Sequence, residues 1–335
     1  MKLVRFQQGT GEAQFGVVID EKVVSFKAAM TVLGTISPEL ASMEAYLANL
    51  PRSHDLAKAV VNGVDISAVE GVFATDDVRF LAPIPKPPAL LDFGLSPRHL
   101  ENASLTMIKK EWGKIAKTVL SPLVKRKFRR MPASEMRYYK CNHNTIIGDG
   151  DTVGWPTYTS YLDIEPELGI VFGTPEQPIA GYLIYNDASA RDVQMPEMMG
   201  SGPARSKDFA RGQGIGPFLV TADEVPDPLS LKVTAKIGGR FVWNGSTSEY
   251  NNHPRDVVSY LQTIFPVLSG TIIGMGTIPD CSGLDNDEWI WPGDAIEISF
   301  SGLGTLHQQI PAAPLDLEKT RWKARPEMNN AHLNS

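Results

Sequence analysis

The stretch YLDIEPELGIVF, residues 161–172, alternates apolar and acidic side chains and predicts a β-strand with one acidic face. The acids on this face are Asp163, Glu165 and Glu167. Side chains two positions apart on a strand lie on the same side at about 7 Å. Two carboxylates at that distance repel by about 2 kcal/mol at an effective dielectric constant near 20. Either water solvates this face, or arginines or a hard divalent cation offset the repulsion.

The composition is that of a globular chain with a sizeable core. Of 335 residues, 42% are hydrophobic and 21% are charged, and the net charge of -6 argues against attraction to nucleic acid or to an anionic membrane. Two cysteines, Cys141 and Cys281, are too few for a disulfide framework. The first residues lack the apolar segment of a signal peptide, and no apolar run reaches the roughly 18 residues of a membrane span. We therefore expect a soluble, cytoplasmic protein.

Turn and strand signals divide the chain into three parts. Residues 1–82 are predicted to form a small β-rich N-terminal domain with a helix at 37–50, and the proline-rich segment 81–90 marks its end. Residues 83–315 are expected to form the catalytic domain, and 316–335 a tail. Within the catalytic domain we predict a hairpin at Gly238–Gly239 and a helix at 253–268. The fold class is mainly β with a few helices (α+β).

Two local features qualify this picture. Pro166 lies between the two glutamates and has no N–H to donate, which predicts an edge strand or a bulge. Residues 99–135 are predicted to be a helical, basic lid, with nine Lys or Arg and one acid between Lys109 and Arg130. This lid is interpreted as a solvated helical face, as a surface that attracts an anionic substrate, or as a contact for nucleic acid or membrane.

Further polar residues follow apolar strand-like runs, where a strand fixes the direction of the side chain. Asp187 ends the run YLIYND, and Asp92 ends PALLD with His99 seven residues later. Lys207 follows in a glycine-rich stretch. Each of these alone is more often a turn former or a structural residue. Their combination indicates a site.

The sequence at these residues resembles the fumarylacetoacetate hydrolase family from about Lys86 to Ile310. The resemblance rests on EPE (165–167), NDASARDVQ (186–194), KDF (207–209), GT (276–277) and PGD (292–294). It implies a β-roll core, often preceded by a small N-terminal domain, and a homodimer. It also implies a cation, Mg²⁺ or else Mn²⁺ or Ca²⁺, on four carboxylates, which here are Asp92, Glu165, Glu167 and Asp187. Asp163 is then not a ligand.

The same resemblance assigns the catalytic roles. It implies that His99 is the general base for water, and that Glu101, or another glutamate distant in sequence, orients it, since Asn102 replaces the glutamate that many members carry. The residues that it places against the substrate are Tyr139, Arg191, Gln194, Lys207 and Thr277. The expected substrate is a small 1,3-diketo acid or 2-oxo acid, cleaved at a C–C bond. Alternatives are decarboxylation of an oxaloacetate-type acid, tautomerisation, tailoring of a larger polyketone, and a binding protein without turnover.

Three other enzyme classes fit poorly. The segment GQGIG (212–216) resembles the dinucleotide fingerprint G-x-G-x-x-G, but its third glycine comes one position too early. A β-type run follows it instead of a helix. No G-x-S-x-G elbow of a serine hydrolase is present. The six histidines and two cysteines do not show the spacing of a zinc site.

Overall fold

The computed structural model describes residues 1–200, 202–312, 317–323, 325 and 328. The described strands are β1 Lys2–Gln7, β2 Gln14–Ile19, β3 Lys22–Ser25, β4 Phe73–Ala74, β5 Arg79–Leu81, β6 Leu90–Phe93, β7 Tyr138–Lys140, β8 Ile146–Ile147, β9 Leu162–Asp163, β10 Pro166–Phe172, β11 Ile179–Asp187, β12 Ser189–Ala190, β13 Gln213–Thr221, β14 Lys232–Ile237, β15 Phe241–Ser246, β16 Ile272–Thr277, β17 Ala295–Phe300 and β18 Gly304–Gln309. The described α-helices are α1 Phe26–Val32, α2 Met43–Ala48, α3 Arg52–Gly63, α4 Pro97–Arg129, α5 Arg191–Met199, α6 Pro254–Ile264 and α7 Gly283–Asn286. Short 3₁₀ turns are Pro38–Leu40, Ile66–Ala68, Thr75–Asp77, His143–Thr145, Ala222–Glu224 and Thr247–Glu249.

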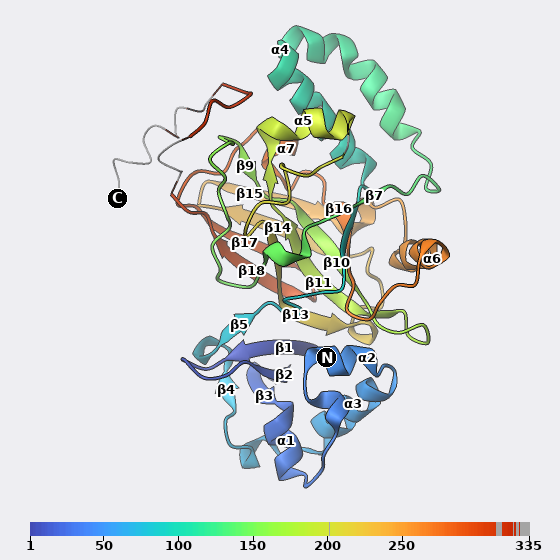
Figure 1. Cartoon of the computed structure of the whole chain (residues 1–335), viewed down its shortest axis with the longest axis vertical. Coiled ribbons are helices and arrows are strands. Elements are labelled where there is room, and N and C mark those ends of the chain that lie inside the picture. The colour runs from blue at the N-terminus through green and yellow to red at the C-terminus, as the bar shows by residue number, and fades with distance from the viewer. Residues whose placement is uncertain (201, 313–316, 324, 326–327, 329–335) are drawn as a thin grey trace.

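A long mixed sheet runs through the molecule in the order β4-β3-β2-β1-β13-β11-β10-β16-β6-β7 (Figure 1). A second sheet, β15-β14-β17-β18, packs beside β11 and β13. A large apolar core lies between them, to which β10 contributes Leu168, Ile170 and Phe172. The predicted α+β class is confirmed.

Local sequence explains several of these elements. The hairpin β14–β15 turns at Gly238 and Gly239, both with positive φ, as predicted. Helix α6 begins at Pro254, and a capping box between His253 and Asp256 satisfies its first N–H groups. The sequence prediction did not identify α1 and α3 in the N-terminal region.

The opening stretch forms two strands instead of one. Asp163 ends β9, which pairs with β12, whereas Glu167 lies on β10 between β11 and β16. An edge position for Pro166 is therefore wrong, because Pro166 pairs with Asn186 of β11 and its carbonyl accepts from Ile278 N on the other side. The register of β10 and β16 is irregular between Glu167 and Gly169, and a bulge at Pro166 itself stays a prediction. Every residue of β10 is buried, so the acidic face is not solvated by water.

The N-terminal strands continue the large sheet, because β1 pairs with β13 through Lys2↔Val220 and Leu3↔Leu219. The boundary at 82/83 stays a prediction, and the boundary at 315/316 lies outside the described residues, as does most of the expected tail. Ion pairs also join the two parts. Asp223 in the 3₁₀ turn after β13 lies 2.6 Å from Lys58 Nζ and 3.3 Å from His54 Nε2, both on α3.

These ion pairs predict a pH-dependent stability. Partial burial acts to raise the pKa of Asp223, but the hydrogen bonds from Lys58 and Thr221 outweigh it and hold the pKa well below its ordinary range. A carboxylate of this kind stabilises the fold above its unfolded pKa, and the contribution is lost as the pH falls through the folded pKa. We expect Asp223→Asn to be less stable than the wild type at pH 7, with a difference that shrinks below about pH 4. Urea unfolding at several pH values measures it.

The matched control is Glu12→Gln, which removes an exposed acid from a loop. It is expected to leave the unfolding free energy unchanged to within about 0.5 kcal/mol. An Asp223→Asn difference that stays constant from pH 7 to pH 3 would contradict the assignment.

Candidate metal centre and active site

Three buried carboxylates, Asp92, Glu167 and Asp187, come together at one point of the large sheet. Each offers an oxygen, and these oxygens lie within 4.8 Å of one another. Asp92 belongs to β6, Glu167 to β10, and Asp187 is the last residue of β11. Three of the four expected metal ligands are therefore brought together by strands that are distant in sequence.

Gly274 on β16 allows this convergence. It pairs with Asp92 on one side and Gly169 on the other, so β16 lies between the strands that carry Asp92 and Glu167. A Cβ at this position would lie 2.6 Å from Glu167 Oε2 and 2.8 Å from Asp92 Oδ1. The two carboxylates meet across β16 because this residue has no side chain.

The donor set fits a hard divalent cation. Within the described chain, Asp92 Oδ1 and Glu167 Oε1 are buried without a hydrogen-bond partner. Burial, with the nearby charge of Asp187, raises the pKa of Asp92 to about 7. Burial and the charge of Asp92 raise the pKa of Glu167 well above its usual value. These oxygens have no hydrogen-bond partner, and their carboxyl groups are not readily ionised at the same time. A divalent cation such as Mg²⁺, Mn²⁺ or Ca²⁺ would bind to oxygens of this kind and offset their negative charge.

Glu165 lies beside this group but is held by cations of the chain. Lys207 Nζ contacts Glu165 Oε2 and lies 2.5 Å from Asp187 Oδ2. Arg191 Nη1 donates to Glu165 Oε1 at 2.6 Å. Burial alone would raise the pKa of Glu165, but Arg191 and Lys207 hold it well below its usual range. Its role as a fourth metal ligand stays a prediction.

His99 faces Glu165 and is oriented by Asp285. Its Nδ1 lies 3.0 Å from Asp285 Oδ1, and its Nε2 lies 3.6 Å from Glu165 Oε1. Burial favours the neutral ring, but the charge of Asp285 and its hydrogen bond raise the pKa of His99 overall. The predicted role of Glu101 is thus corrected. The carboxylate bonded to His99 comes from α7, which is 186 residues away, whereas Glu101 lines a surface cavity with Arg98 and Arg129.

The other expected substrate-facing residues occupy the same region. The Tyr139 hydroxyl lies within hydrogen-bond distance of Asp92 and Asp187. Thr277 is buried at the end of β16, paired in register with Glu167. Gln194 accepts from Arg191 Nη1 at 2.9 Å. Arg191 Nη2 is buried without a partner among the described residues, so one donor of this guanidinium is available to a bound anion.

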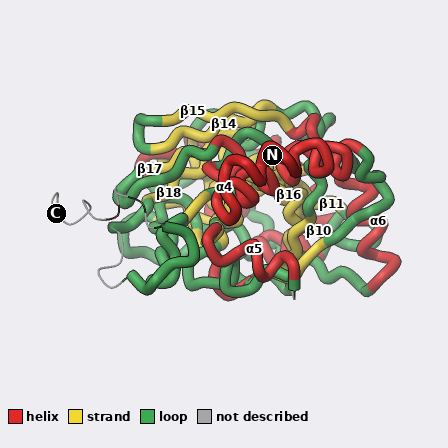
Figure 2. Tube along the Cα trace, turned by 90° about the horizontal axis from the view of Figure 1, so that it is seen from above, coloured by secondary structure: helices red, strands yellow, loops and turns green. Residues whose placement is uncertain are grey.

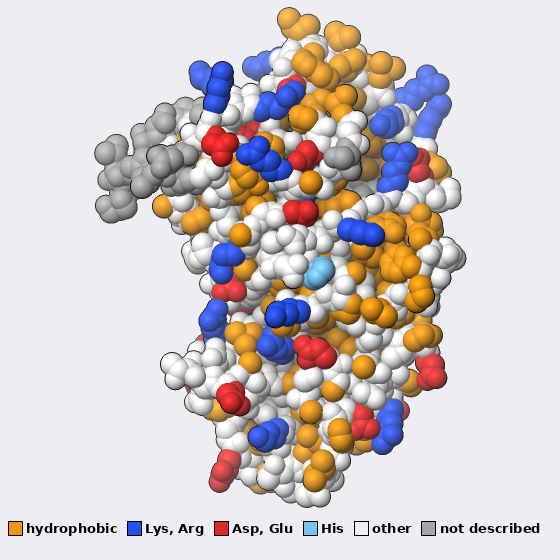
Figure 3. Space-filling model, viewed as in Figure 1, with side chains coloured by type: hydrophobic (Ala, Val, Ile, Leu, Met, Phe, Trp, Pro, Cys, Tyr) orange, Lys and Arg blue, Asp and Glu red, His pale blue; other side chains and the backbone are white. Residues whose placement is uncertain are grey.

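The predicted lid corresponds to α4, which bends at Gly113, where φ is 87°. Its first half packs on α7. Figure 1 shows α4 at the end of the molecule opposite to the N-terminal strands, and Figure 2 shows it in front when the molecule is seen from above. None of residues 111–130 is buried. Ile115, Val119 and Leu123 are among its exposed apolar residues. Figure 3 shows hydrophobic and basic side chains together at this end of the molecule. Exposure of α4 is common to all three interpretations, so they stay predictions.

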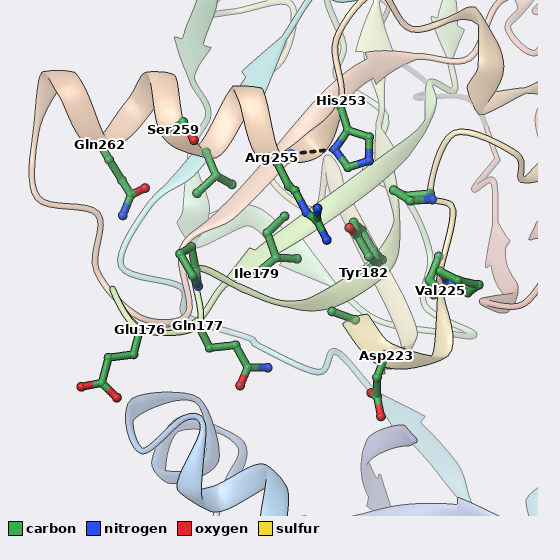
Figure 4. Close-up of a pocket in the computed structure, with 15 residues that line it drawn as sticks. Glu176, Gln177, Ile179, Tyr182, Asp223, Val225, His253, Arg255, Ser259 and Gln262 are labelled. Atoms are coloured by element: carbon green, nitrogen blue, oxygen red, sulfur yellow. Dashed lines mark hydrogen bonds between the residues drawn. The ribbon is translucent and has the colours of Figure 1, made fainter.

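A separate surface cavity of about 590 Å³ lies between α6, the β10–β11 turn and the loop after β13. Figure 4 shows Arg255, His253 and Tyr182 around it, with the helix-capping hydrogen bond from Arg255 N to His253 Nδ1. It contains none of the residues expected in the site. The convergence of buried titratable groups therefore identifies the site better than cavity size does.

Comparisons with known proteins agree with the fold and with the family that the sequence resembles. The sequence model of the fumarylacetoacetate (FAA) hydrolase C-terminal domain matches residues 114–311. The chain belongs to the fumarylacetoacetate hydrolase family, as the sequence resemblance indicated. A curated relative, the 2-dehydro-3-deoxy-D-arabinonate dehydratase of Saccharolobus solfataricus, is 29% identical over 254 residues, which cover 73% of this chain and 79% of the relative.

Solved structures share the fold. The maleylpyruvate hydrolase of Sphingobium sp. SYK-6, in complex with manganese(II) and pyruvate, aligns with a TM-score of 0.66 at 17% identity, over 94% of this chain and 100% of that one. The fumarylacetoacetate hydrolase of Exiguobacterium antarcticum aligns with a TM-score of 0.66 at 23% identity, with the same coverage. Among the described helices, none combines the length and the hydropathy needed to cross a bilayer.

The metal assignment predicts opposite effects of Glu167→Gln with and without a cation. Without a divalent ion the substitution replaces an acid whose ionised form burial and Asp92 disfavour, so the melting temperature is expected to stay equal or rise. With Mg²⁺ or Mn²⁺ the wild type is expected to gain stability by ligand linkage, about 2.7 kcal/mol at a hundred times the Kd. The variant is expected to lose most of this gain. Thermal unfolding in chelator and in metal measures both effects, and equal stabilisation of the two proteins would contradict the assignment.

A second prediction concerns the space that Gly274 leaves between Asp92 and Glu167. Gly274→Ala places a methyl group against Asp92 and Glu167, so we expect Mn²⁺ affinity to fall by about tenfold or more. Isothermal titration calorimetry measures this directly. The control is Gly63→Ala at the end of α3, where a Cβ would meet its nearest neighbour at 3.8 Å. Unchanged Mn²⁺ affinity in Gly274→Ala would show that the cation binds elsewhere.

Proposed function

We propose that this protein is a divalent-metal-dependent hydrolase that cleaves a C–C bond in a 1,3-diketo acid, such as an acylpyruvate. The observation that carries this proposal is the His99–Asp285 pair, in which Nε2 of His99 lies 3.6 Å from Glu165 Oε1 beside the carboxylate cluster. A histidine fixed in this way is suited to take a proton from water. Membership of the family supports the proposal.

The cation would be held by Asp92, Glu167 and Asp187, with Glu165 as the proposed fourth ligand. When bound, it would supply a Lewis acid for the oxygens of a 2-oxo acid. Mg²⁺ is the proposed ion, with Mn²⁺ and Ca²⁺ as alternatives, because all three accept carboxylate oxygens. The manganese in the Sphingobium structure belongs to that protein and supports the choice of chemistry.

His99 acts on water in this proposal. Asp285 accepts the Nδ1 hydrogen and thereby leaves Nε2 as the acceptor. Nε2 removes a proton from water while the oxygen attacks the acyl carbonyl farther from the carboxylate. The bond between this carbon and the central carbon then breaks, and its electrons remain on the central carbon as an enolate. Return of the proton completes hydrolysis to a carboxylic acid and a 2-oxo acid.

The buried cations of the chain stabilise the negative charge that develops. Lys207 lies between Glu165 and Asp187, so its charge is placed next to the cluster. The unpaired Nη2 of Arg191 is available to the carboxylate of the substrate. In a buried site these interactions are stronger than in water. The remaining proposals are that Tyr139, Gln194 and Thr277 contact the substrate, that the protein is a cytoplasmic homodimer, and that it binds neither nucleic acid nor membrane.

Dehydration of a 2-oxo-3-deoxy sugar acid is the second candidate, favoured by the similarity to the Saccharolobus dehydratase. The same base would then remove a proton from carbon instead of water. Decarboxylation, tautomerisation and tailoring of a larger polyketone need the same enolate stabilisation. The products formed by the purified protein distinguish these reactions.

The test is turnover of acetylpyruvate, followed by loss of its enol absorbance with Mg²⁺ or Mn²⁺ and then with excess chelator. We expect metal-dependent formation of acetate and pyruvate. His99→Ala is expected to lower kcat/KM by about 10²–10⁴-fold, the usual contribution of a general base. Asp285→Asn is also expected to reduce kcat, because it can stabilise the wrong tautomer of the ring.

The control is Glu101→Gln, next to the base but on the surface cavity, which is expected to keep kcat within about twofold. Oxaloacetate and a 2-oxo-3-deoxy pentonate are assayed in parallel. Full turnover by His99→Ala would exclude hydrolysis by this base and favour decarboxylation. Release of water from the pentonate, with no cleavage of acetylpyruvate, would establish the dehydratase instead.

A further inference from the structure

We infer that Asp163 is a positioning residue that keeps the His99–Asp285 pair in register with Glu165 and the carboxylate cluster. The inference rests on the proposed function for its kinetic consequences. Asp163 is not among the clustered metal-binding carboxylates and is completely buried. Its contacts connect the element that carries the orienting acid of the base to the arginine that holds Glu165.

Four donors saturate the Asp163 carboxylate. Oδ1 accepts from the backbone N–H of Gly283 at 2.7 Å and from that of Ile164 at 2.9 Å. Oδ2 accepts from the backbone N–H of Leu284 at 2.9 Å and from Arg191 Nε at 2.8 Å. A carboxylate has about four lone-pair sites, so none is left for a cation. This carboxylate therefore acts as a fixed anchor and not as a ligand.

One set of these hydrogen bonds connects Asp163 to the base. Gly283 and Leu284 form the first turn of α7, and the next residue is Asp285, which bonds to His99. A Cβ on Gly283 would lie 2.7 Å from Asp163 Oδ1, so the backbone approaches the carboxylate as closely as only glycine permits. Asp163 thereby fixes the position of Asp285, and Asp285 fixes the direction of the imidazole ring of His99.

The hydrogen bond with Arg191 connects Asp163 to Glu165 and the carboxylate cluster. Arg191 donates through Nε to Asp163 and through Nη1 to Glu165. Because a guanidinium is planar and rigid, fixing Nε also fixes the direction of Nη1. Glu165 in turn contacts Lys207. One carboxylate therefore determines the relative placement of the base and of the acids that it faces.

An asparagine at this position cannot satisfy all four donors, and in either orientation of the side chain it leaves one backbone N–H of α7, that of Gly283 or that of Leu284, without an acceptor. Its amide has a single acceptor oxygen, and its NH₂ group would face donors from Arg191 or from the α7 backbone. Asp163→Asn should therefore displace α7, and in one orientation of the amide Arg191 as well, while changing the side-chain volume very little. We expect kcat to fall by about 10–100-fold, as is usual when a group that orients catalytic ligands is lost, with a smaller change in KM.

The decisive experiment is a double-mutant cycle in the full-length protein. The part of the loss that Asp163 transmits through Asp285 disappears in the Asp285→Asn background, so Asp163→Asn is expected to cost at least about threefold less in kcat there than in the wild type. An equal fold loss in both backgrounds would overturn the inference, since it would show an independent or merely structural role. Asp192→Asn is the control. Asp192 is also completely buried and bonds to Thr159 and Ser160, away from α7, so it is expected to lower the melting temperature without a selective loss of kcat.

A spectroscopic readout separates this inference from the proposed function. In wild-type protein we expect a downfield Nδ1–H proton resonance for His99 bonded to Asp285, assigned by its absence in His99→Ala. Asp163→Asn is expected to lose or shift this resonance, and Asp192→Asn to retain it. An unchanged resonance in Asp163→Asn would overturn the inference even if no tested substrate is turned over. If Asp163→Asn does not fold, Gly283→Ala perturbs the same contact from the side of α7 and is read in the same way.

Discussion

The burial of several carboxylates at one place is the constraint on which the site depends. Asp92, Glu167 and Asp187 come together and are each at most 3% exposed to solvent. Counting also Asp163 and Glu165, five buried carboxylates face two buried cations of the chain, Lys207 and Arg191, which leaves a formal charge of -5 + 2 = -3. Unpaired buried charges cost several kcal/mol each. A divalent cation and one proton would balance this count, and the raised pKa values of Asp92 and Glu167 reflect the same imbalance.

The sheet is what makes this burial possible. Its central strands β11, β10, β16 and β6 are neighbours, and all seven residues of β10 are buried. Acids on both sides of β16 meet because Gly274 leaves the space between them. The pairing of β1 with β13 extends the same sheet into the N-terminal region, whose apolar residues share a core with β11 and β16. The low dielectric of this interior strengthens each contact of the cluster.

The sequence predicted features with a local signature. The period-two pattern identified the extended segment that forms β9 and β10, the paired glycines identified the β14–β15 hairpin, and the motifs identified the three carboxylates that converge. Long-range partners had no such signature. Asp285 lies in a four-residue helix, where an aspartate reads as a turn former, and its bond to His99 spans 186 residues. Arg191 was expected to face the substrate, but Nε and Nη1 are bonded to Asp163 and Glu165, which leaves only Nη2. The pairing of β1 with β13 joins segments that are far apart in sequence, so the local pattern did not predict it either.

Two kinds of interaction hold the base and the cluster. Along its outer side, α4 meets the 280–287 segment through partly exposed ion pairs, such as Arg98 Nη2 with Asp280 at 2.5 Å. Exposed pairs of this kind contribute at most about 1 kcal/mol each. The buried contacts of Asp285 and Asp163 are more costly to break, because an unsatisfied buried charge would remain. The register between base and cluster is therefore determined mainly by these two carboxylates, and the basic surface of α4 contributes little to it.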